Sequence, residues 1–240
     1  MIDSKEQLRI HSFESLGAVD GPGIRFVIFT QGCHLRCKYC QNRDTWDIKS
    51  GKIYNIKDVV EKIERYIPYM QGEGGITVSG GEPLLQVDAL ITLFKEMKKR
   101  NIHTAIDTSG NLPITDKIKE LIELTDLFLL DIKCINDNIC KDLVGASNKL
   151  ELEFAKYLSD NGKEMWIRQV LIPGYTDNEE DLKELKAFID SLKTVTKVEI
   201  LPYHNLGKFK WENMNVPYEF ENVKIPTNEE VKKAKQILGI

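Results

Sequence analysis

Residues 24–40 read IRFVIFTQGCHLRCKYC, and they carry the clearest signal of the fold class. Its first part, 24–29, is an apolar run typical of a strand that is covered by helices. Three cysteines follow at Cys33, Cys37 and Cys40, with the spacing C-x3-C-x2-C. Loops at the carboxyl ends of parallel strands usually carry the chemistry of an α/β protein. The stretch therefore predicts a parallel sheet with a functional loop after its first strand.

The rest of the chain repeats the order of strand and helix. Five more apolar runs have the length of strands, at residues 76–79, 103–107, 127–132, 166–172 and 198–202. Helical patterns with a period of 3.6 residues fill the gaps. Three of them have start signals, which are Asn55, Asp177-Asn178, and a capping box of Thr227 with Glu230. Six such units in series predict an α/β fold with a parallel sheet, open or curled.

No linker of low complexity interrupts the chain. We therefore expect a single domain over residues 1–240, with the core at about 20–205 and a C-terminal extension and helix at 206–240.

The composition indicates a soluble, globular protein. Of its 240 residues, 42% are hydrophobic and 29% are charged, and the net charge of −4 gives no basic footprint for nucleic acid. Residues 1–9 are polar, so we expect no signal peptide, and no apolar run approaches the roughly 20 residues that span a bilayer. We expect a cytoplasmic protein, in which five cysteines indicate ligands rather than disulfides.

Three thiolates on one short loop can converge on a metal centre, and soft sulfur ligands select zinc or an iron–sulfur cluster. A zinc site would need His34 or a distant cysteine as its fourth ligand, but structural zinc ligands usually come in close pairs. Cys134 and Cys140 lack that spacing, and we interpret both as ordinary buried cysteines. Because a four-iron cluster normally has four cysteine ligands, three predict a [4Fe-4S] cluster with one open iron.

The cysteine spacing, with the aromatic Tyr39 before the last cysteine, resembles the radical S-adenosylmethionine (SAM) superfamily. Residues 79–83 (SGGEP) follow the second strand, as the Gly-Gly-Glu-Pro motif of that superfamily does. Taken alone, the segment is also a plausible turn with Pro83 at a helix start. The resemblance implies that SAM binds the open iron, and that its reductive cleavage gives a 5′-deoxyadenosyl radical.

Further segments narrow the resemblance to the activases of glycyl-radical enzymes. They are 20–25 (DGPGIR), 41–46 (QNRDTW), 131–133 (DIK), 166–168 (WIR) and 201–204 (LPYH). Many of these activases carry an inserted ferredoxin-like segment with extra cysteines, which this chain lacks, and this favours the branch that activates pyruvate formate-lyase. Gln41 stands where a member of the family carries His, and because Gln does not titrate, a proton-transfer role there is not expected.

For this branch the resemblance implies an anaerobic reaction. The radical removes a hydrogen atom from one glycine of pyruvate formate-lyase and leaves a glycyl radical on that partner. The expected electron donor is reduced flavodoxin or ferredoxin, and the expected state is a monomer. Because the substrate is a protein loop, we expect an open lateral cleft, and therefore a partial (β/α)6 TIM-like barrel with parallel strands.

The resemblance also assigns roles to residues. The expected catalytic residues are Cys33, Cys37, Cys40 and Lys133. The expected SAM contacts are Tyr39, Cys40, Gln41, Gly81, Asp131, Ile132, Lys133 and His204. Asp131 and Lys133 share one face because side chains alternate along a strand, and the alternative is a surface ion pair. For Tyr39 the alternative is a core aromatic residue, and for His204 it is a structural role.

Two smaller sites follow from the resemblance. Asp107, Thr108 and Asp131 match a site for a monovalent cation (Na⁺ or K⁺), which oxygen ligands suit. A helix cap is the alternative for the first two residues. Asp20 and Arg168 match positions that hold the glycyl loop of the partner, and for Arg168 the alternative is an internal ion pair.

Two other functions compete with this prediction. One is a radical SAM enzyme that acts on a small molecule or on another activase target. The other is a zinc-stabilised binding module, which a metal analysis would recognise by one zinc and a colourless protein.

Overall fold

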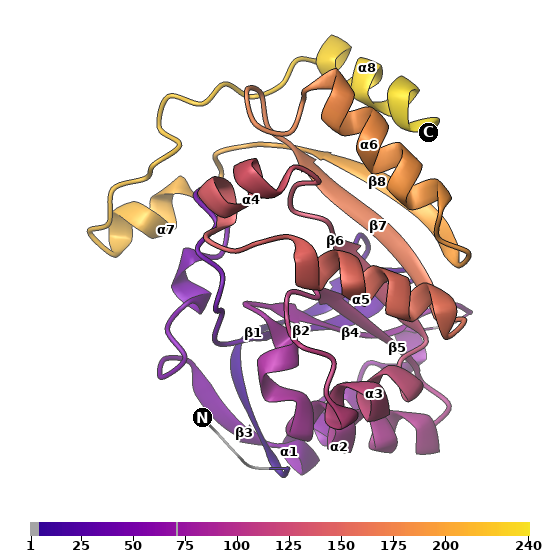
Figure 1. Ribbon diagram of the computed structural model, residues 1–240. Helices are drawn as coiled ribbons and strands as arrows, with labels where there is room; N and C mark the ends of the chain where they lie inside the picture. The colour runs from indigo at the N-terminus through magenta and orange to yellow at the C-terminus, as the bar shows by residue number, and fades with distance from the viewer. Residues whose placement is uncertain (1–4, 71) are drawn as a thin grey trace. The chain divides into compact units, whose positions relative to one another are not determined.

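The computed structural model describes residues 5–70 and 72–240 (Figure 1). The strands are β1 (Gln7–Gly17), β2 (Arg25–Thr30), β3 (Lys52–Asn55), β4 (Gly75–Gly80), β5 (His103–Thr108), β6 (Leu127–Asp131), β7 (Glu164–Leu171) and β8 (Val195–Pro202). The α-helices are α1 (Ile56–Glu64), α2 (Val87–Lys99), α3 (Asp116–Glu123), α4 (Asp137–Val144), α5 (Lys149–Asp160), α6 (Glu179–Asp190), α7 (Lys208–Asn213) and α8 (Asn228–Leu238). Short 3₁₀ helices lie at η1 (Arg43–Thr45), η2 (Ile67–Tyr69) and η3 (Pro83–Gln86).

The strands form an open, mostly parallel sheet, so the predicted α/β class is confirmed. Their order is β3-β1-β2-β4-β5-β6-β7-β8. The pairs β2·β4, β4·β5 and β7·β8 are parallel, and all six predicted apolar runs are strands. β1 and β3 are additional, and β1 pairs in antiparallel fashion with both β2 and β3.

β1 was not recognised in the sequence because the alternation of apolar and polar residues along this strand is interrupted. Leu8 and Ile10 are fully buried, as in a regular strand with one apolar face. The pairing with β2 then shifts register between Ile10 and Ser12 and again between Glu14 and Gly17. Each shift breaks the period of two that would identify a strand in the sequence.

Contacts divide the chain into two compact units. Unit 1 comprises Met1–His34, Thr45–Thr108 and Leu112–Leu129, and unit 2 comprises Leu35–Asp44, Ser109–Asn111 and Leu130–Ile240. The boundary between His34 and Leu35 falls inside the cysteine loop, which is residues 31–42 between β2 and η1. The single domain expected over the whole chain stays a prediction.

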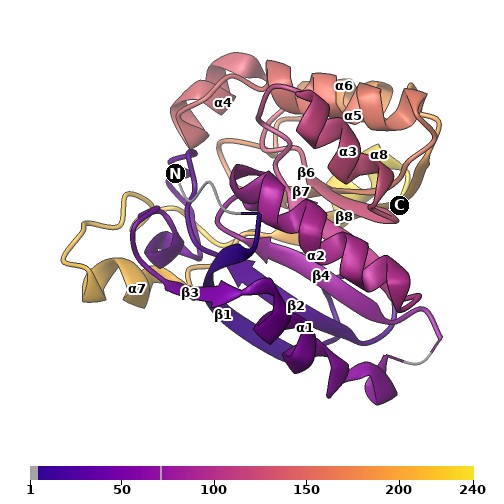
Figure 2. The same ribbon diagram turned by 90° about the horizontal axis from the view of Figure 1, so that it is seen from below.

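In unit 1, α1 and α2 cover one face of the strands (Figure 2). The predicted apolar stripe of α1 is buried at Ile56, Val59, Val60 and Ile63. Asn55 is the N-cap residue by position, but its side chain makes no capping hydrogen bond.

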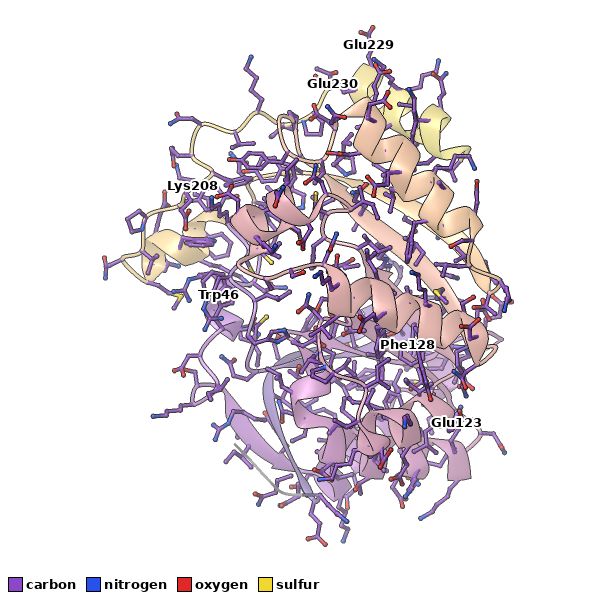
Figure 3. The ribbon with its side chains drawn as sticks, viewed as in Figure 1. Trp46, Glu123, Phe128, Lys208, Glu229 and Glu230 are labelled. Carbon is purple, nitrogen blue, oxygen red and sulfur yellow. The ribbon has the colours of Figure 1, made fainter. Side chains whose placement is uncertain are left out.

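In unit 2, α6 packs against α8, and an extended segment leads from β8 through α7 to α8 (Figure 1). The predicted start signals are confirmed here. The Asn178 side chain accepts hydrogen bonds from the backbone N–H groups of Glu180 and Asp181. Thr227 and Glu230 form the reciprocal capping box at the first turn of α8, where Figure 3 labels Glu230.

Within the described residues, no helix combines the length and the apolar character needed to cross a membrane.

Candidate functional site

The cysteine loop begins in unit 1, where the segment after β4 packs against it. The N–H of Gly81 donates to the carbonyl of Thr30 (3.0 Å), and the N–H of Glu82 donates to the carbonyl of Gly32 (2.8 Å). A Cβ on Gly81 would lie 2.1 Å from the Gly32 oxygen and 3.3 Å from Cys33 Cβ. Glycine is therefore required here for the close approach of two backbone segments.

The Glu82 side chain makes its hydrogen bonds within unit 1. It is 2% exposed, accepts a hydrogen bond from Thr108 Oγ1 (2.5 Å), and caps η3 through the N–H of Leu84 (3.2 Å). Pro83 is the first residue of η3, as predicted for a helix start.

The rest of the cysteine loop lies in unit 2, where it is held by the end of α4. The N–H groups of Arg36 and Lys38 donate to the carbonyls of Val144 (2.9 Å) and Leu143 (3.0 Å). The Lys38 ammonium also pairs with Asp142 (2.7 Å). The chain then turns, and the N–H of Cys40 donates to the carbonyl of Cys37 (3.0 Å). Both flanks of Cys37 are thus fixed by backbone hydrogen bonds.

Tyr39 is a buried aromatic residue, which was the alternative interpretation. Its side chain is 6% exposed, and its ring centroid lies 6.2 Å from that of Phe220. Burial raises the pKa of the Tyr39 phenol well above its ordinary value. Among the described residues, its hydroxyl oxygen has no hydrogen-bond partner, so a polar atom of a ligand could still bind there.

Asp131 and Lys133 pair with each other. The two charged atoms are 2.7 Å apart, and the side chains are only 23% and 15% exposed, so this is no ordinary surface pair. Burial is the largest single influence and lowers the pKa of Lys133, but the acidic groups around the ammonium, with Asp131 first among them, together outweigh it and raise that pKa well above its ordinary value. Ile132, between them, is fully buried, and its N–H donates to the carbonyl of Arg168 (2.9 Å).

Glu151 on α5 binds the backbone next to this ion pair. It is fully buried, and its Oε1 accepts a hydrogen bond from the backbone N–H of Lys133 (3.2 Å). Within the described residues its Oε2 has no hydrogen-bond partner. Burial raises the pKa of this carboxyl well above its ordinary range, which favours the neutral acid.

Arg168 forms an internal ion pair, as the alternative interpretation expected. Its Nε lies 2.8 Å from Glu199 Oε2, and its side chain is 8% exposed. Asp20, the other expected contact of the partner loop, lies in a turn of unit 1, where its carbonyl accepts a hydrogen bond from Thr77 Oγ1 (2.5 Å). The same hydroxyl accepts from Arg25 Nε (3.0 Å), so a buried guanidinium supports this turn.

His204 and Gln41 lie together in unit 2. Gln41 Nε2 donates to the carbonyl of His204 (2.8 Å), while the His204 ring accepts from the N–H of Leu206 (3.3 Å). The His204 side chain is exposed.

The residues of the expected cation site fall in different units. Asp107 in unit 1 accepts a hydrogen bond from Ser79 Oγ (2.7 Å), and the Thr108 hydroxyl donates to Glu82. Asp131 belongs to unit 2. Over residues 5–70 and 72–240, no three His, Cys, Asp or Glu side chains are grouped as ligands of a metal ion.

The cysteine loop fits an iron–sulfur cluster. Cys33, Cys37 and Cys40 lie within eight residues of the chain, so one loop carries all three sulfurs. A cluster binds its cysteines on different iron atoms, so the three sulfurs need not surround one point as the ligands of a single ion do. Soft thiolates are also the donors that iron–sulfur clusters select.

The other two cysteines are structural. Cys134 and Cys140 are 1% and 0% exposed. Burial raises the pKa of the Cys134 thiol to about 11 and that of Cys140 further still, which suppresses the thiolate that binds metals.

The parallel α/β sheet and the three-cysteine loop after β2 together define a protein of the radical SAM class. The sequence model of the Radical SAM superfamily matches residues 27–186 of the chain. Among solved structures, SuiB of Streptococcus suis bound to S-adenosylmethionine superposes with a TM-score of 0.67 at 19% identity, over 89% of this chain and 46% of that one. This structural likeness bears on the fold alone.

Curated relatives identify the branch of the class. The chain is 50% identical over 232 residues to the pyruvate formate-lyase-activating enzyme of Staphylococcus epidermidis, covering 94% of this chain and 92% of the relative. It is 47% identical over 232 residues to the pyruvate formate-lyase 1-activating enzyme of Escherichia coli (strain K12), covering 96% of this chain and 94% of the relative. The chain belongs to the family of pyruvate formate-lyase activating enzymes.

Sequence analysis did not single out Glu151 or Trp211. Glu151 looks like one more charge on a helix, and only its full burial separates it from its neighbours. Trp211 is 2% exposed, and its indole N–H donates to the carbonyl of Cys40 (2.9 Å). In the sequence, Trp211 stands out as a lone tryptophan in a short charged helix, but this pattern does not reveal that its indole binds the Cys40 carbonyl.

Proposed function

We propose that this chain activates pyruvate formate-lyase under anaerobic conditions by generating a glycyl radical on it. The observation that carries the proposal is the identity of 47% and 50% with curated activating enzymes, over nearly the whole length of both chains. The three-cysteine loop after β2 supports it, because that loop can hold the redox centre that such chemistry needs.

The radical SAM family implies a [4Fe-4S] cluster and SAM as cofactors. When bound, these groups supply the 5′-deoxyadenosyl radical that removes a hydrogen atom from a glycine of the partner. Cys33, Cys37 and Cys40 would hold the cluster as thiolates and leave one iron without a protein ligand. The backbone hydrogen bonds around Cys37 fix the loop in advance, which lowers the entropy lost when the cluster binds.

The proposed SAM contacts are Tyr39, Cys40, Gln41, Gly81, Asp131, Ile132, Lys133 and His204. The Tyr39 hydroxyl lacks a hydrogen-bond partner in the described part of the chain, which supports a polar contact from a ligand. Lys133 keeps its positive charge because Asp131 stabilises it, so the ammonium suits a carboxylate or ribose oxygen of SAM.

Two further assignments belong to the proposal. Asp107, Thr108 and Asp131 would supply oxygen ligands to a monovalent cation, Na⁺ or K⁺. Asp20 and Arg168 would hold the glycyl loop of the partner. For Arg168 this role requires the remaining N–H groups of its guanidinium, because Nε already donates to Glu199.

Pyruvate formate-lyase is the proposed protein substrate, and reduced flavodoxin or ferredoxin the proposed electron donor. We also propose that the enzyme works as a cytoplasmic monomer with an open lateral cleft for the partner loop.

The decisive experiment mixes the anaerobically reconstituted chain with pyruvate formate-lyase, SAM and a reductant. Electron paramagnetic resonance (EPR) should detect a glycyl radical on the partner. If 5′-deoxyadenosine forms without that signal, the enzyme acts on another substrate, and the proposal is wrong.

A further inference from the structure

Trp211 connects the segment after β8 to the cysteine loop. Its indole Nε1 donates a hydrogen bond to the carbonyl oxygen of Cys40 (2.9 Å). The ring is 2% exposed and packs edge-on against Tyr218, with centroids 5.4 Å apart. On another side the Arg43 guanidinium lies 5.4 Å from the ring centroid. The indole is therefore held in one orientation, with its N–H aimed at the backbone of a cysteine expected to bind the cluster.

Gln41, the next residue of the loop, makes a second connection. Its Nε2 donates to the carbonyls of Tyr39 (3.0 Å) and His204 (2.8 Å). Its Oε1 accepts the N–H of Gly207 (2.6 Å). A Cβ on Gly207 would lie 2.6 Å from Gln41 Cα, so the two backbones approach closely enough to require glycine. The side-chain amide thus uses both its donor and its acceptor ends to join the two segments.

Lys210 makes the third connection, which is partly exposed to solvent. Its ammonium donates to Asn42 Oδ1 (2.9 Å) and to Asp44 Oδ1 (3.1 Å). Lys208, labelled at the start of α7 in Figure 3, instead pairs with Glu221 (2.6 Å). Partly exposed pairs of this kind stabilise a structure weakly, so most of the stabilisation comes from the buried indole of Trp211 and the half-buried amide of Gln41.

We propose that residues 204–211 form a latch that positions the Cys40 end of the cysteine loop. The positioning residues are Trp211 on the latch and Gln41 on the loop. Groups that hydrogen-bond a ligand residue hold it in its binding orientation and slow its departure. The latch lies more than 160 residues from Cys40 along the chain, so it ties the loop to the folded state of the C-terminal segment. The cluster bound at this loop rests on the proposed function, whereas the latch contacts belong to the chain itself.

The first test measures thiol alkylation in the metal-free full-length protein at constant pH, with mass spectrometry to assign each cysteine. Trp211→Phe keeps an aromatic ring but removes the N–H donor. A single hydrogen bond corresponds to a change of about twofold to tenfold in local opening, so the alkylation rate of Cys40 should rise by that factor. Cys134 and Cys140, which are buried elsewhere in unit 2, should keep their wild-type rates. A Cys40 rate within 1.5-fold of wild type, or an equal rise at all three cysteines, would overturn the proposal.

The matched control is Trp166→Phe. Trp166 lies in β7, and the Lys197 ammonium lies 4.2 Å from its ring centroid. This variant loses an indole N–H outside the latch, so its Cys40 rate should equal that of wild type. If it accelerates Cys40 as much as Trp211→Phe does, the effect is general and the latch is refuted.

The second test uses the reconstituted holoenzyme. Gln41→Leu conserves approximate volume but removes both connections to the latch. Iron should leave this variant for an excess of chelator about twofold to tenfold faster than it leaves wild type, and Trp211→Phe should behave likewise. Unchanged release rates in both variants would contradict the proposal even if one variant folds poorly.

These measurements separate the two claims. If wild type binds iron but forms no glycyl radical on pyruvate formate-lyase, the proposed function fails while the latch is still judged by alkylation and iron release. If the radical forms but neither rate depends on Trp211 or Gln41, the latch fails and the function stands.

Discussion

Replacing Gly81 by Ala should displace the start of the cysteine loop. The new Cβ would lie 2.1 Å from the Gly32 carbonyl oxygen, and this contact has to open to at least 3.0 Å. Because that oxygen also accepts the N–H of Glu82 (2.8 Å), the movement stretches a hydrogen bond. Overpacking of this kind destabilises by about 1–3 kcal/mol, and the weakened hydrogen bond adds about 1 kcal/mol. We expect Gly81→Ala to lower the free energy of unfolding by about 2–4 kcal/mol in total.

The assay is urea denaturation of the metal-free protein, combined with iron content after anaerobic reconstitution. Gly162→Ala is the matched control, since Gly162 has a φ of 68° and no atom within 4 Å of the added Cβ. Backbone strain alone should lower its stability by about 1 kcal/mol. Its iron content should equal that of wild type, whereas Gly81→Ala should bind less iron. If Gly81→Ala is no less stable than Gly162→Ala and binds iron normally, the close approach of Gly81 to Gly32 does not limit the position of the loop.

Three further predictions concern buried groups of unit 2. Lys133→Met leaves the Asp131 carboxylate without the ammonium 2.7 Å away, so the free energy of unfolding in urea should fall by about 1–3 kcal/mol; an unchanged midpoint would contradict this. Burial raises the pKa of Glu151, so the stability it contributes is present below the unfolded pKa of about 4.3 and is lost as pH rises through the folded pKa. Glu151→Gln lacks this loss, so the variant should gain stability relative to wild type between pH 5 and pH 8, and a constant difference would refute the assignment. Finally, Cys134→Ala and Cys140→Ala should each bind as much iron as wild type, and a loss of iron in either would make that cysteine a ligand.

The order of strands and helices could be predicted because its signals are local. Buried parallel strands are continuous apolar runs, and the starts of α6 and α8 are marked by Asn178 and by Thr227 with Glu230. β3 was missed for the opposite reason: it is short, and Ile53 within it is 44% exposed. Such a strand is stabilised by pairing with β1, and the four residues of β3 alone do not predict this pairing.

The site could be predicted in part. The sequence located the loop and the residues at the ends of the strands, and the spacing of Asp131 and Lys133 already allowed the two to pair, but the partner of Arg168 could not be named. Arg168 pairs with Glu199 because the two residues lie opposite each other in the register of β7 and β8, which the sequence does not give. The contacts of Trp211 were equally hidden, because they join residues 171 positions apart in the chain.

We propose that this chain generates a glycyl radical on pyruvate formate-lyase, and one EPR measurement detects that radical itself. The reconstituted chain, SAM and a reductant are incubated anaerobically with pyruvate formate-lyase, beside a sample that contains Cys37→Ala in place of wild type. We predict a glycyl-radical signal with wild type and no signal with the variant. A complete absence of signal with iron-loaded wild type, or an equal signal from the Cys37→Ala variant, would contradict the account.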